Sequence, residues 1–451
     1  MNWFNNKKHL DFHLERHLDD IEIPANLQIN DQIKRYRQKC AEVGCHRPYH
    51  HFAFGQSPFP PPEIIVKALR DNAQKHDYVP TAGIPELRHA VSDYYNNVFN
   101  LQTSAEQVVV SPGSKEMISM ILGVLAGPVI IPTPSWVSYL PQAKILKKKV
   151  IPVAVDYSNG YKITPGQLKS ILKKDHQQHI LILNNPNNPT GAVYSAKELE
   201  AIAGICRKYH VVVIADEIYA RTTFRFYRFV SMGRIYPEGT IITGGLSKDR
   251  SAGGYRLGVG IFPDDRNLIN DILILAGSTY SCVAAPIQYA SLAAYSQNPE
   301  IEKYIQDCSL IHRTIGNITA GMLNRIPGVK ASFPEGAFYL FVDFNHYGTK
   351  LRKLGLNSCK NFCEHLIRVE HTALLPGSSL LLDDDNFSVR LSYVDYDGSA
   401  VLKAWQENPP ENEEEKIKFF ESNCPLIDHG IKNIARYLSQ VNEDKMPVHV
   451  P

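Results

Sequence analysis

Short apolar segments alternate with helix-like segments from Gln107 to about Thr243, and this alternation constrains the fold more than any other feature. Continuous Val- and Ile-rich runs of this kind are typical of parallel strands that are covered on both faces. Capping boxes at 164–167 (TPGQ) and 195–198 (SAKE) predict helix starts between the strands. The sequence therefore predicts an α/β domain with a mostly parallel sheet between helices. The expected strands are QVVV (107–110), PVII (128–131), VIPVAV (150–155), HILIL (179–183), VVVIA (211–215) and TIIT (240–243).

A different pattern follows residue 300. The segments GAFYLFVDF (336–344) and NFSVRLSYV (386–394) indicate antiparallel strands, and IDHGIKNIARYL (427–438) indicates an amphipathic helix. We therefore expect a second, smaller α+β domain, which residues near the N-terminus help to complete. The acidic segment ENPPENEEEK (407–416) has two prolines and no apolar anchor, which predicts a solvated loop.

The change of pattern near residue 300 also defines the expected domain boundaries. The first 25 residues are polar, with Leu10, Leu14 and His17 at helical spacing, and we expect them to form an extra arm. The expected units are an N-terminal arm (1–25), the N-terminal part of the small domain (26–62), the large domain (63–300) and the C-terminal part of the small domain (301–451).

The charge balance argues against several classes of function. The chain has 48 basic and 46 acidic residues, so a net charge of +2 creates no field that attracts nucleic acid or an anionic membrane. The stretch before Phe54 is too short for a DNA-binding domain with a linker. No segment approaches the roughly 20 apolar residues of a membrane span, and the start of the chain lacks the apolar core of a signal peptide. Eight cysteines without a CxxC pair favour a reducing compartment, so we expect a cytoplasmic protein.

Polar clusters follow four of the expected strands, at the edge of the sheet where α/β proteins bind their ligands. After QVVV comes SPGSKE (111–116), a helix start at which the backbone N–H groups of Ser114 and Lys115 suit a phosphate. An ordinary capped helix is the alternative, and the Walker pattern GxxxxGK[ST] is not satisfied. After HILIL comes NNPNNPTG (184–191), a turn with more Asn and Pro than a simple connector needs.

The next two strands end in charged residues. Asp216 follows a fully apolar strand, where a carboxylate is costly to bury unless it is paired, so we expect a cationic partner. A helix N-cap is the alternative for this residue. Lys248 follows TIIT among glycines, and a desolvated lysine becomes a nucleophilic amine. Arg256, eight positions later, has the planar fork that binds a phosphate.

Together these segments resemble the class I/II (fold type I) aminotransferases that use pyridoxal 5′-phosphate. The resemblance extends from about Phe54 to Leu391, and the order and spacing of the motifs both fit. It implies a seven-stranded sheet in the large domain, amino acid and 2-oxo acid substrates, and a homodimer with shared active sites. The matching segments are YVPTAGIPELR (78–88), SPGSKE, PSWVSY (134–139), NNPNNPTG, DEIY (216–219), SK (247–248), GGYRLG (253–258) and SVRLS (388–392).

The resemblance assigns the catalytic roles to Lys248, Asp216 and Tyr219. Lys248 corresponds to the lysine that forms a Schiff base with the cofactor and then moves the proton from the substrate Cα. Asp216 corresponds to the acid that pairs with the pyridine nitrogen, so that the ring accepts electrons. Tyr219 and Asn188 correspond to the pair that hydrogen-bonds the phenolic oxygen, and Trp136 to the aromatic residue that stacks on the ring.

The resemblance also assigns the binding residues. Tyr78 corresponds to a tyrosine that reaches the phosphate from the other subunit, and Gly55 to a glycine close to the substrate carboxylate. Asn188 is expected at the substrate as well as at the cofactor. The phosphate is expected to be held by Ser114, Lys115, Ser247 and Arg256.

Arg390 has support from strand periodicity as well as from the resemblance. In NFSVRLSYV the apolar residues share one strand face, and Arg390 shares the other with Ser388 and Ser392. The family uses an arginine at this position to clamp the substrate α-carboxylate in a bidentate pair. A solvated arginine would follow the same periodicity.

Several alternatives stay open. The same lysine and acid serve C–S and other β-lyases, decarboxylases and aminocyclopropane-carboxylate synthases, because the site chooses which bond breaks. Lys115 lies where some aspartate- and prephenate-type relatives bind a distal carboxylate, which favours aspartate or glutamate over aromatic substrates. Asp249 and Arg250 have no assigned role. A zinc site competes with these interpretations, but its Cys-x4-Cys spacing is loose, so we expect no metal. Its candidate ligands are Cys40, Cys45, His46, His50 and His51.

Overall fold

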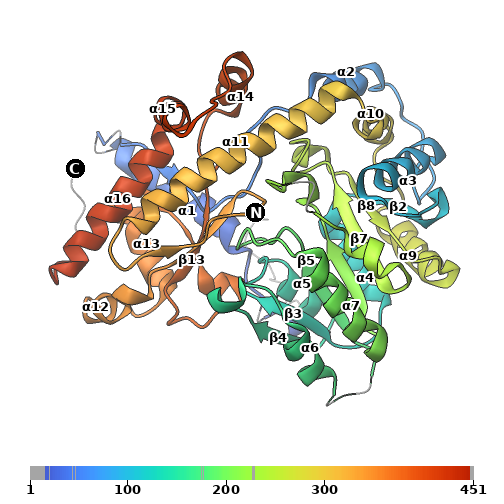
Figure 1. Ribbon diagram of the computed structural model, residues 1–451, viewed down its shortest axis with the longest axis horizontal. Coiled ribbons are helices and arrows are strands. Elements are labelled where there is room, and N and C mark those ends of the chain that lie inside the picture. The colour runs from blue at the N-terminus through green and yellow to red at the C-terminus, as the bar shows by residue number, and fades with distance from the viewer. Residues whose placement is uncertain are drawn as a thin grey trace, which may run out of the picture.

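The computed structural model describes residues 16–446, except 20, 43, 46, 174, 176 and 226–228. A seven-stranded sheet has the strand order β2-β8-β7-β6-β5-β3-β4 (Figure 1). Neighbours from β7 to β4 are parallel, and β8 is antiparallel to both β2 and β7. The predicted mostly parallel sheet is therefore confirmed. Its strands are β2 (Val108–Ser111), β3 (Val129–Thr133), β4 (Val150–Ala154), β5 (Ile180–Asn184), β6 (Val212–Asp216), β7 (Thr240–Gly245) and β8 (Gly258–Ile261).

All six expected strands of this sheet are present, and β8 is the strand that sequence patterning missed. Its sequence is GVGI, and glycine weakens the strand signal. Residues of one strand alternate between two apolar clusters, because successive side chains point to opposite faces. Leu181 and Leu183 pack into one cluster, whereas Ile180 and Ile182 pack into the other. Both faces of the sheet are thus covered, as the continuous apolar runs predict.

Helices of the large domain pack against this sheet and against each other. The two predicted capping boxes are formed: Thr164 accepts a hydrogen bond from the Gln167 backbone N–H, and Ser195 from that of Glu198. The helices are α2 (Glu63–Asp71), α3 (Pro85–Phe99), α4 (Ser114–Val124), α5 (Tyr139–Ile145), α6 (Pro165–Leu172), α7 (Ala196–Tyr209), α8 (Met232–Ile235), α9 (Arg266–Thr279) and α10 (Ala285–Tyr295).

A four-stranded antiparallel sheet with the order β12-β13-β10-β9 forms the centre of the smaller unit. The long helix α11 (Pro299–Asn324) begins beside the end of α10 and extends along the smaller unit (Figure 1). The antiparallel strands and the C-terminal helix predicted from sequence are confirmed. The strands are β9 (Lys330–Ala331), β10 (Tyr339–Asp343), β12 (Leu375–Pro376) and β13 (Ser388–Ser392), and the helices are α12 (Gly348–Lys353), α13 (Cys359–Glu370), α14 (Gly398–Glu407), α15 (Glu413–Asn423) and α16 (Pro425–Asn442).

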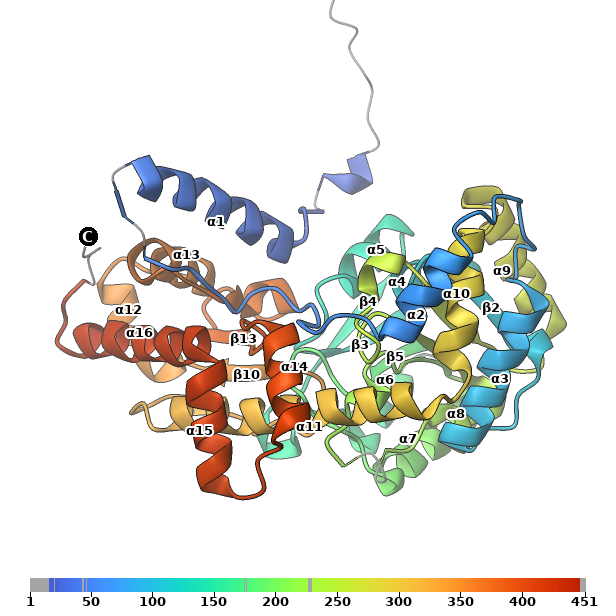
Figure 2. The same ribbon diagram turned by 90° about the horizontal axis from the view of Figure 1, so that it is seen from above.

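The N-terminal part of the chain packs on this smaller unit. Helix α1 (Ala25–Glu42) runs along the outside of α13 (Figure 2). Strand β1 (His50–His51) pairs in parallel with β11 (Thr372–Ala373). His17 lies in a short 3-10 helix, η1 (Arg16–Leu18), whereas Leu10 and Leu14 lie outside the described residues. The expected domain boundaries stay predictions.

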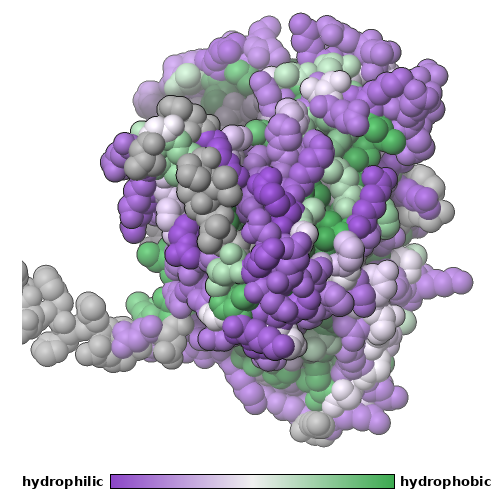
Figure 3. All heavy atoms as spheres, turned by 90° about the vertical axis from the view of Figure 1, so that its left-hand side faces the viewer, coloured by the Kyte–Doolittle hydropathy of each residue, from purple (hydrophilic) through white to green (hydrophobic). Residues whose placement is uncertain are grey.

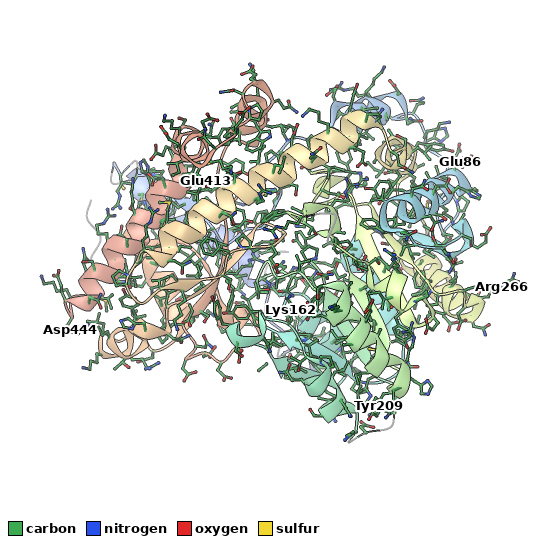
Figure 4. All side chains as sticks on the ribbon, in the orientation of Figure 1. Glu86, Lys162, Tyr209, Arg266, Glu413 and Asp444 are labelled. Atoms are coloured by element: carbon green, nitrogen blue, oxygen red, sulfur yellow. The ribbon has the colours of Figure 1, made fainter. Side chains whose placement is uncertain are left out.

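The expected solvated loop at 407–416 is wrong over its second half. Helix α15 begins at Glu413, which Figure 4 labels at the start of the helix. The side chain of Asn412 accepts a hydrogen bond from the backbone N–H of Glu415 at 3.0 Å. Three glutamates in the first turn interact favourably with the helix dipole. The buried side chains that hold this helix against the protein are Phe419 and Phe420, which follow the end of the predicted loop at residue 416.

Hydrophilic residues cover most of the face at the small-domain end of the molecule (Figure 3). Among the described residues, no helix combines the length and the apolar character that crossing a membrane requires.

Candidate active site

Eleven of the twelve predicted site residues meet in one cavity of about 480 Å³. This volume is typical of a small-molecule site. The exception is Tyr78, which is 92% exposed on the surface of the chain and does not line the cavity. The eleven lining residues are Gly55, Ser114, Lys115, Trp136, Asn188, Asp216, Tyr219, Ser247, Lys248, Arg256 and Arg390.

Lys248 lies in the loop after β7 and points into the cavity. Its Nζ donates a hydrogen bond to the carbonyl oxygen of Gly55 at 2.9 Å and lies 5.4 Å from the ring centroid of Tyr219. Burial and, to a smaller extent, the positive charge of Arg390 lower the pKa of Lys248 to about 8, although Asp216 acts in the opposite direction. The amine therefore has a sizeable neutral fraction near neutral pH, which a nucleophile requires.

The lowered pKa of Lys248 can be measured directly. Only a neutral amine reacts with acetic anhydride, so the labelling rate rises with pH and levels off above the pKa. We expect a midpoint near pH 8 for Lys248 in the folded apoprotein, against an ordinary value of 10.5. At pH 7 the neutral fraction is then about 300-fold larger than that of an ordinary lysine. Mass spectrometry of labelled peptides measures this rate, with the unfolded protein as the control. A midpoint above pH 10 in the folded protein contradicts the prediction.

Asp216 ends strand β6 and is only 4% exposed. Its Oδ2 accepts a hydrogen bond from the hydroxyl of Tyr139 at 2.6 Å. Burial raises the pKa of Asp216, whereas the Tyr139 hydrogen bond and the charge of Lys248 favour the carboxylate. The alternative role as a helix N-cap is wrong, because the next element is the short 3-10 helix η4 (Ala220–Thr222). A cationic group bound beside this acid would hold it in its charged form.

The start of α4 and Arg256 form one end of the cavity. Gly113 caps the helix with φ = 94°, and a Cβ at this position would collide with the guanidinium of Arg256. Glycine therefore lets the guanidinium lie against the helix start, where its Nη2 donates to the Pro112 carbonyl at 2.9 Å. The first backbone N–H groups of a helix have no partner within the helix. Together with Ser247 they suit a phosphate.

Arg390 lies in β13, is only 3% exposed and lines the cavity. Its Nη1 donates to Asn188 Oδ1 at 3.1 Å, and its Nη2 donates to the carbonyl oxygen of Ala53 at 2.7 Å. Within the described part of the chain, its buried Nε has no hydrogen-bond partner. A buried guanidinium without an acidic partner in reach of a cavity suits a carboxylate ligand.

Aromatic side chains complete the wall. The hydroxyls of Tyr219 and Tyr339 are 2.6 Å apart, and the guanidinium carbon of Arg390 lies 4.7 Å from the Tyr339 ring centroid. Trp136 packs edge-on against Tyr139 with ring centroids 5.1 Å apart. A Cβ on Gly55 would collide with the Tyr339 ring, so glycine allows the chain to pass close to this ring.

Sequence reasoning missed three residues of the site. Tyr139 holds Asp216, and Tyr339 holds Tyr219. Asn184 donates from Nδ2 to the Asp216 backbone carbonyl at 2.8 Å, and its Oδ1 accepts from the Asn188 backbone N–H at 2.6 Å. Tyr139 and Asn184 lie within the segments PSWVSY and NNPNNPTG. Because both segments follow expected strands, their position could have indicated that these two residues belong to the site. Tyr339 lies in a strand whose pattern indicates only burial.

Asp249 and Arg250, which had no role from sequence, stabilise the loop that carries Lys248. They form an ion pair at 2.7 Å. The guanidinium carbon of Arg250 lies 4.8 Å from the Tyr94 ring centroid and 5.1 Å from that of Tyr295. Arg250 Nε also donates to the carbonyl oxygen of Ala294 at 2.9 Å. The pair therefore fixes the lysine loop to the helices beside it.

The site fits pyridoxal 5′-phosphate on three counts. A helix start with an arginine and a serine suits the phosphate, and a lysine with a lowered pKa suits the aldehyde carbon. A buried acid suits a protonated ring nitrogen. The unpartnered Nε of Arg390 leaves a place for a carboxylate.

Comparisons with known proteins agree with this geometry. The family "Aminotransferase class I and II" matches residues 49–400. An aspartate aminotransferase of Geobacillus stearothermophilus is 33% identical over 352 residues, which are 75% of this chain and 85% of that protein. An aspartate aminotransferase of Bacillus subtilis is 31% identical over 341 residues, or 74% and 84% of the two chains.

A solved structure of an aspartate aminotransferase of Thermus thermophilus has the same fold. It matches with a TM-score of 0.77 at 23% identity and covers 94% of this chain and 100% of its own. The family match extends over more than three quarters of the chain and contains every predicted site residue. This chain therefore belongs to the class I and II aminotransferases and is a transferase that depends on pyridoxal 5′-phosphate.

Proposed function

We propose that this aminotransferase takes the amino group from a dicarboxylic amino acid, aspartate or glutamate, and that 2-oxoglutarate with glutamate forms the second substrate pair. The charge of the cavity carries the proposal. Four basic side chains line it against one acidic side chain, Asp216. A cofactor phosphate and two substrate carboxylates would balance such a surplus of positive charge. The relatives named aspartate aminotransferase support this choice.

The two carboxylates of such a substrate would bind different cations. We assign the α-carboxylate to Arg390, whose planar fork suits a bidentate pair. We assign the distal carboxylate to Lys115, whose Nζ lies 5.2 Å from the ring centroid of Trp136 at the cavity. Burial and the charge of Arg256 lower the pKa of Lys115, so an anionic partner would stabilise its charged form.

The remaining side chains would hold the cofactor and move the proton. Pyridoxal 5′-phosphate, when bound, supplies an electron sink for the bond that breaks at the substrate Cα. Lys248, once free as a neutral amine, would take the proton from the substrate Cα and would deliver it to the C4′ carbon of the cofactor. Asp216, Tyr219 and Asn188 would hold the ring by its polar atoms, and Trp136 would cover its face. The phosphate would be held by Ser114, the Lys115 backbone, Ser247 and Arg256.

Our proposal includes a homodimer in a reducing compartment such as the cytoplasm. Tyr78 is exposed on its own chain, which leaves it available to reach the cavity of a second copy. All eight cysteines are unpaired in this structure, which supports a reducing environment.

A spectroscopic screen of half-reactions across the amino acids tests the substrate. Each amino acid is mixed with the holoenzyme, and the change in cofactor absorbance is followed while the oxo acid product is identified. Aspartate and glutamate should react fastest and give the corresponding 2-oxo acids. Faster reaction with aromatic amino acids contradicts the proposal, and a lyase or decarboxylation product identifies the alternative chemistry.

The substitution Lys115→Gln should reduce kcat/KM for aspartate and glutamate by about 10–100-fold, the value of one charge-assisted hydrogen bond of about 1.5–3 kcal/mol. Amino acids without a distal carboxylate should lose far less. The matched control is Arg390→Lys, which should weaken all amino acids alike. An equal loss for every substrate in Lys115→Gln removes the residue from distal-carboxylate recognition.

A further inference from the structure

A cluster of potential metal ligands lies outside the active site, where α1 meets the smaller unit. Cys40 lies near the end of α1, Cys45 follows in the turn after it, and His371 caps the end of α13. One ligand atom from each lies within 4.8 Å of the others. His371 is 326 residues from Cys45 in sequence, so the cluster exists only in the folded chain.

The turn between the two cysteines brings their sulfur atoms together. The backbone N–H of Cys45 donates to the carbonyl oxygen of Cys40 at 2.8 Å, which closes the chain back on the helix end. Gly44 has φ = 72°, a conformation that glycine adopts without strain. The Cys-x4-Cys spacing is loose in sequence, but this turn makes it compact.

Hydrogen bonding sets the orientation of the His371 ring. Nδ1 lies 3.4 Å from the carbonyl oxygen of Arg47, and because a carbonyl only accepts, Nδ1 carries the proton. In the neutral ring Nε2 is then the nitrogen that acts as an electron-pair donor, and it lies 3.8 Å from Cys40 Sγ. The Tyr49 ring stacks on the imidazole at 4.1 Å and 3° and holds it in place. Metal-binding histidines commonly donate their second N–H to a carbonyl in this way.

We propose that Cys40, Cys45 and His371 bind a zinc ion. Tetrahedral zinc with Zn–S near 2.3 Å and Zn–N near 2.1 Å places its ligand atoms about 3.6–3.8 Å apart, and the Cys40–His371 distance of 3.8 Å agrees. Two thiolates and a neutral imidazole give a complex without net charge, so partial burial carries little desolvation cost. The Tyr49 hydroxyl, 3.5 Å from Cys40 Sγ, can donate to a thiolate. Water takes the fourth position.

The proposed ligands differ from the candidate set within residues 40–51, for which we expected no metal from the sequence. His51 is occupied elsewhere, since Arg37 Nη2 lies 3.1 Å from its Nε2. His50 is not part of the cluster, and His46 lies outside the described residues. The third ligand is instead a histidine from the C-terminal half of the chain.

The metal would connect α1 to the smaller unit. Ile29 and Ile33 of α1 already pack in an apolar cluster with Phe341 and Ile367. Leu27, near the other end of the helix, lines the active-site cavity. Zinc at the end of α1 therefore stabilises a helix that borders the active site.

The test measures metal on the untagged, reduced protein. Elemental analysis after dialysis against Zn²⁺ should give about one zinc per chain. Titration of the metal-free protein with Co²⁺ should produce a thiolate-to-cobalt charge-transfer band and the intense d–d bands of a tetrahedral site. Cys45→Ser and His371→Gln should each weaken Zn²⁺ binding by more than about 100-fold, since even indirect partners contribute 10–100-fold. Cys282→Ser and His51→Gln are the matched controls and should retain full binding.

Three results overturn the proposal: no stoichiometric zinc in the wild-type protein, a cobalt spectrum without the thiolate band, or equal Zn²⁺ affinity in Cys45→Ser and Cys282→Ser. Cys45 lies in a partly exposed turn, so its serine variant is expected to fold, and far-UV circular dichroism verifies this. The wild-type measurement stands even if His371→Gln does not fold. The readout involves no substrate, so it is independent of the proposed aminotransferase specificity.

Discussion

Replacing Lys248 by alanine should lower kcat by about 10⁴-fold or more, the upper range for a positioned acid–base group. The loss is large because, among the described residues that line the cavity, Lys248 is the amine for which burial lowers the pKa to about 8. Lys115 and the two arginines lie elsewhere on the wall. Pyridoxal 5′-phosphate should still bind, because the residues that we propose to hold its phosphate and its ring do not include Lys248. Single-turnover measurements with aspartate and equilibrium dialysis with the cofactor test the two halves of this prediction.

The control for this substitution is Lys248→Arg, which keeps a cation at the position but removes an amine that can become neutral. It should be as inactive as the alanine variant. If either variant retains activity within about tenfold of the wild-type rate, a different group moves the proton and the assignment of Lys248 is wrong.

Asp216→Asn should lower kcat/KM by about 10²–10⁴-fold, which corresponds to the roughly 3–5 kcal/mol lost when one partner of a buried charge pair is removed. An amide keeps the shape of the side chain but cannot neutralise a protonated ring nitrogen. The Tyr139 hydroxyl, now 2.6 Å from Oδ2, would also lose its charged acceptor. Steady-state kinetics together with cofactor affinity measure the effect.

The neighbouring acid Glu217 provides a matched control. It is equally buried, but it accepts hydrogen bonds from the Ser231 hydroxyl and the Met232 backbone N–H, both at 2.9 Å, and does not line the cavity. Burial raises its pKa to about 8, so it is mostly protonated at pH 7 and Glu217→Gln replaces one neutral group by another. If Asp216→Asn and Glu217→Gln lose kcat/KM to a similar extent, Asp216 stabilises the folded structure and does not act on the cofactor.

Much of the site could be predicted because most of its residues lie at or just after the ends of strands in the seven-stranded sheet. The carboxyl ends of β5, β6 and β7 lie side by side, so Asn188, Asp216 and Lys248 are brought together by strand order alone. What the local pattern could not predict is how these groups are held. The hydroxyl on Asp216 comes from a tyrosine 77 residues earlier, and that on Tyr219 from one 120 residues later.

Most of the elements and the type of chemistry could be predicted from sequence, because the periodicity of apolar residues and the chemical type of the residues at strand ends are local properties. Local patterns predicted six strands of the large sheet, the two capped helices, and the lysine, acid and arginines of the site. Tertiary packing selects which distant side chains meet. It placed β8 between β2 and β7, buried Arg250 between two tyrosine rings, and brought His371 to Cys40. Such contacts depend on packing between segments that lie tens to hundreds of residues apart, which no local pattern encodes.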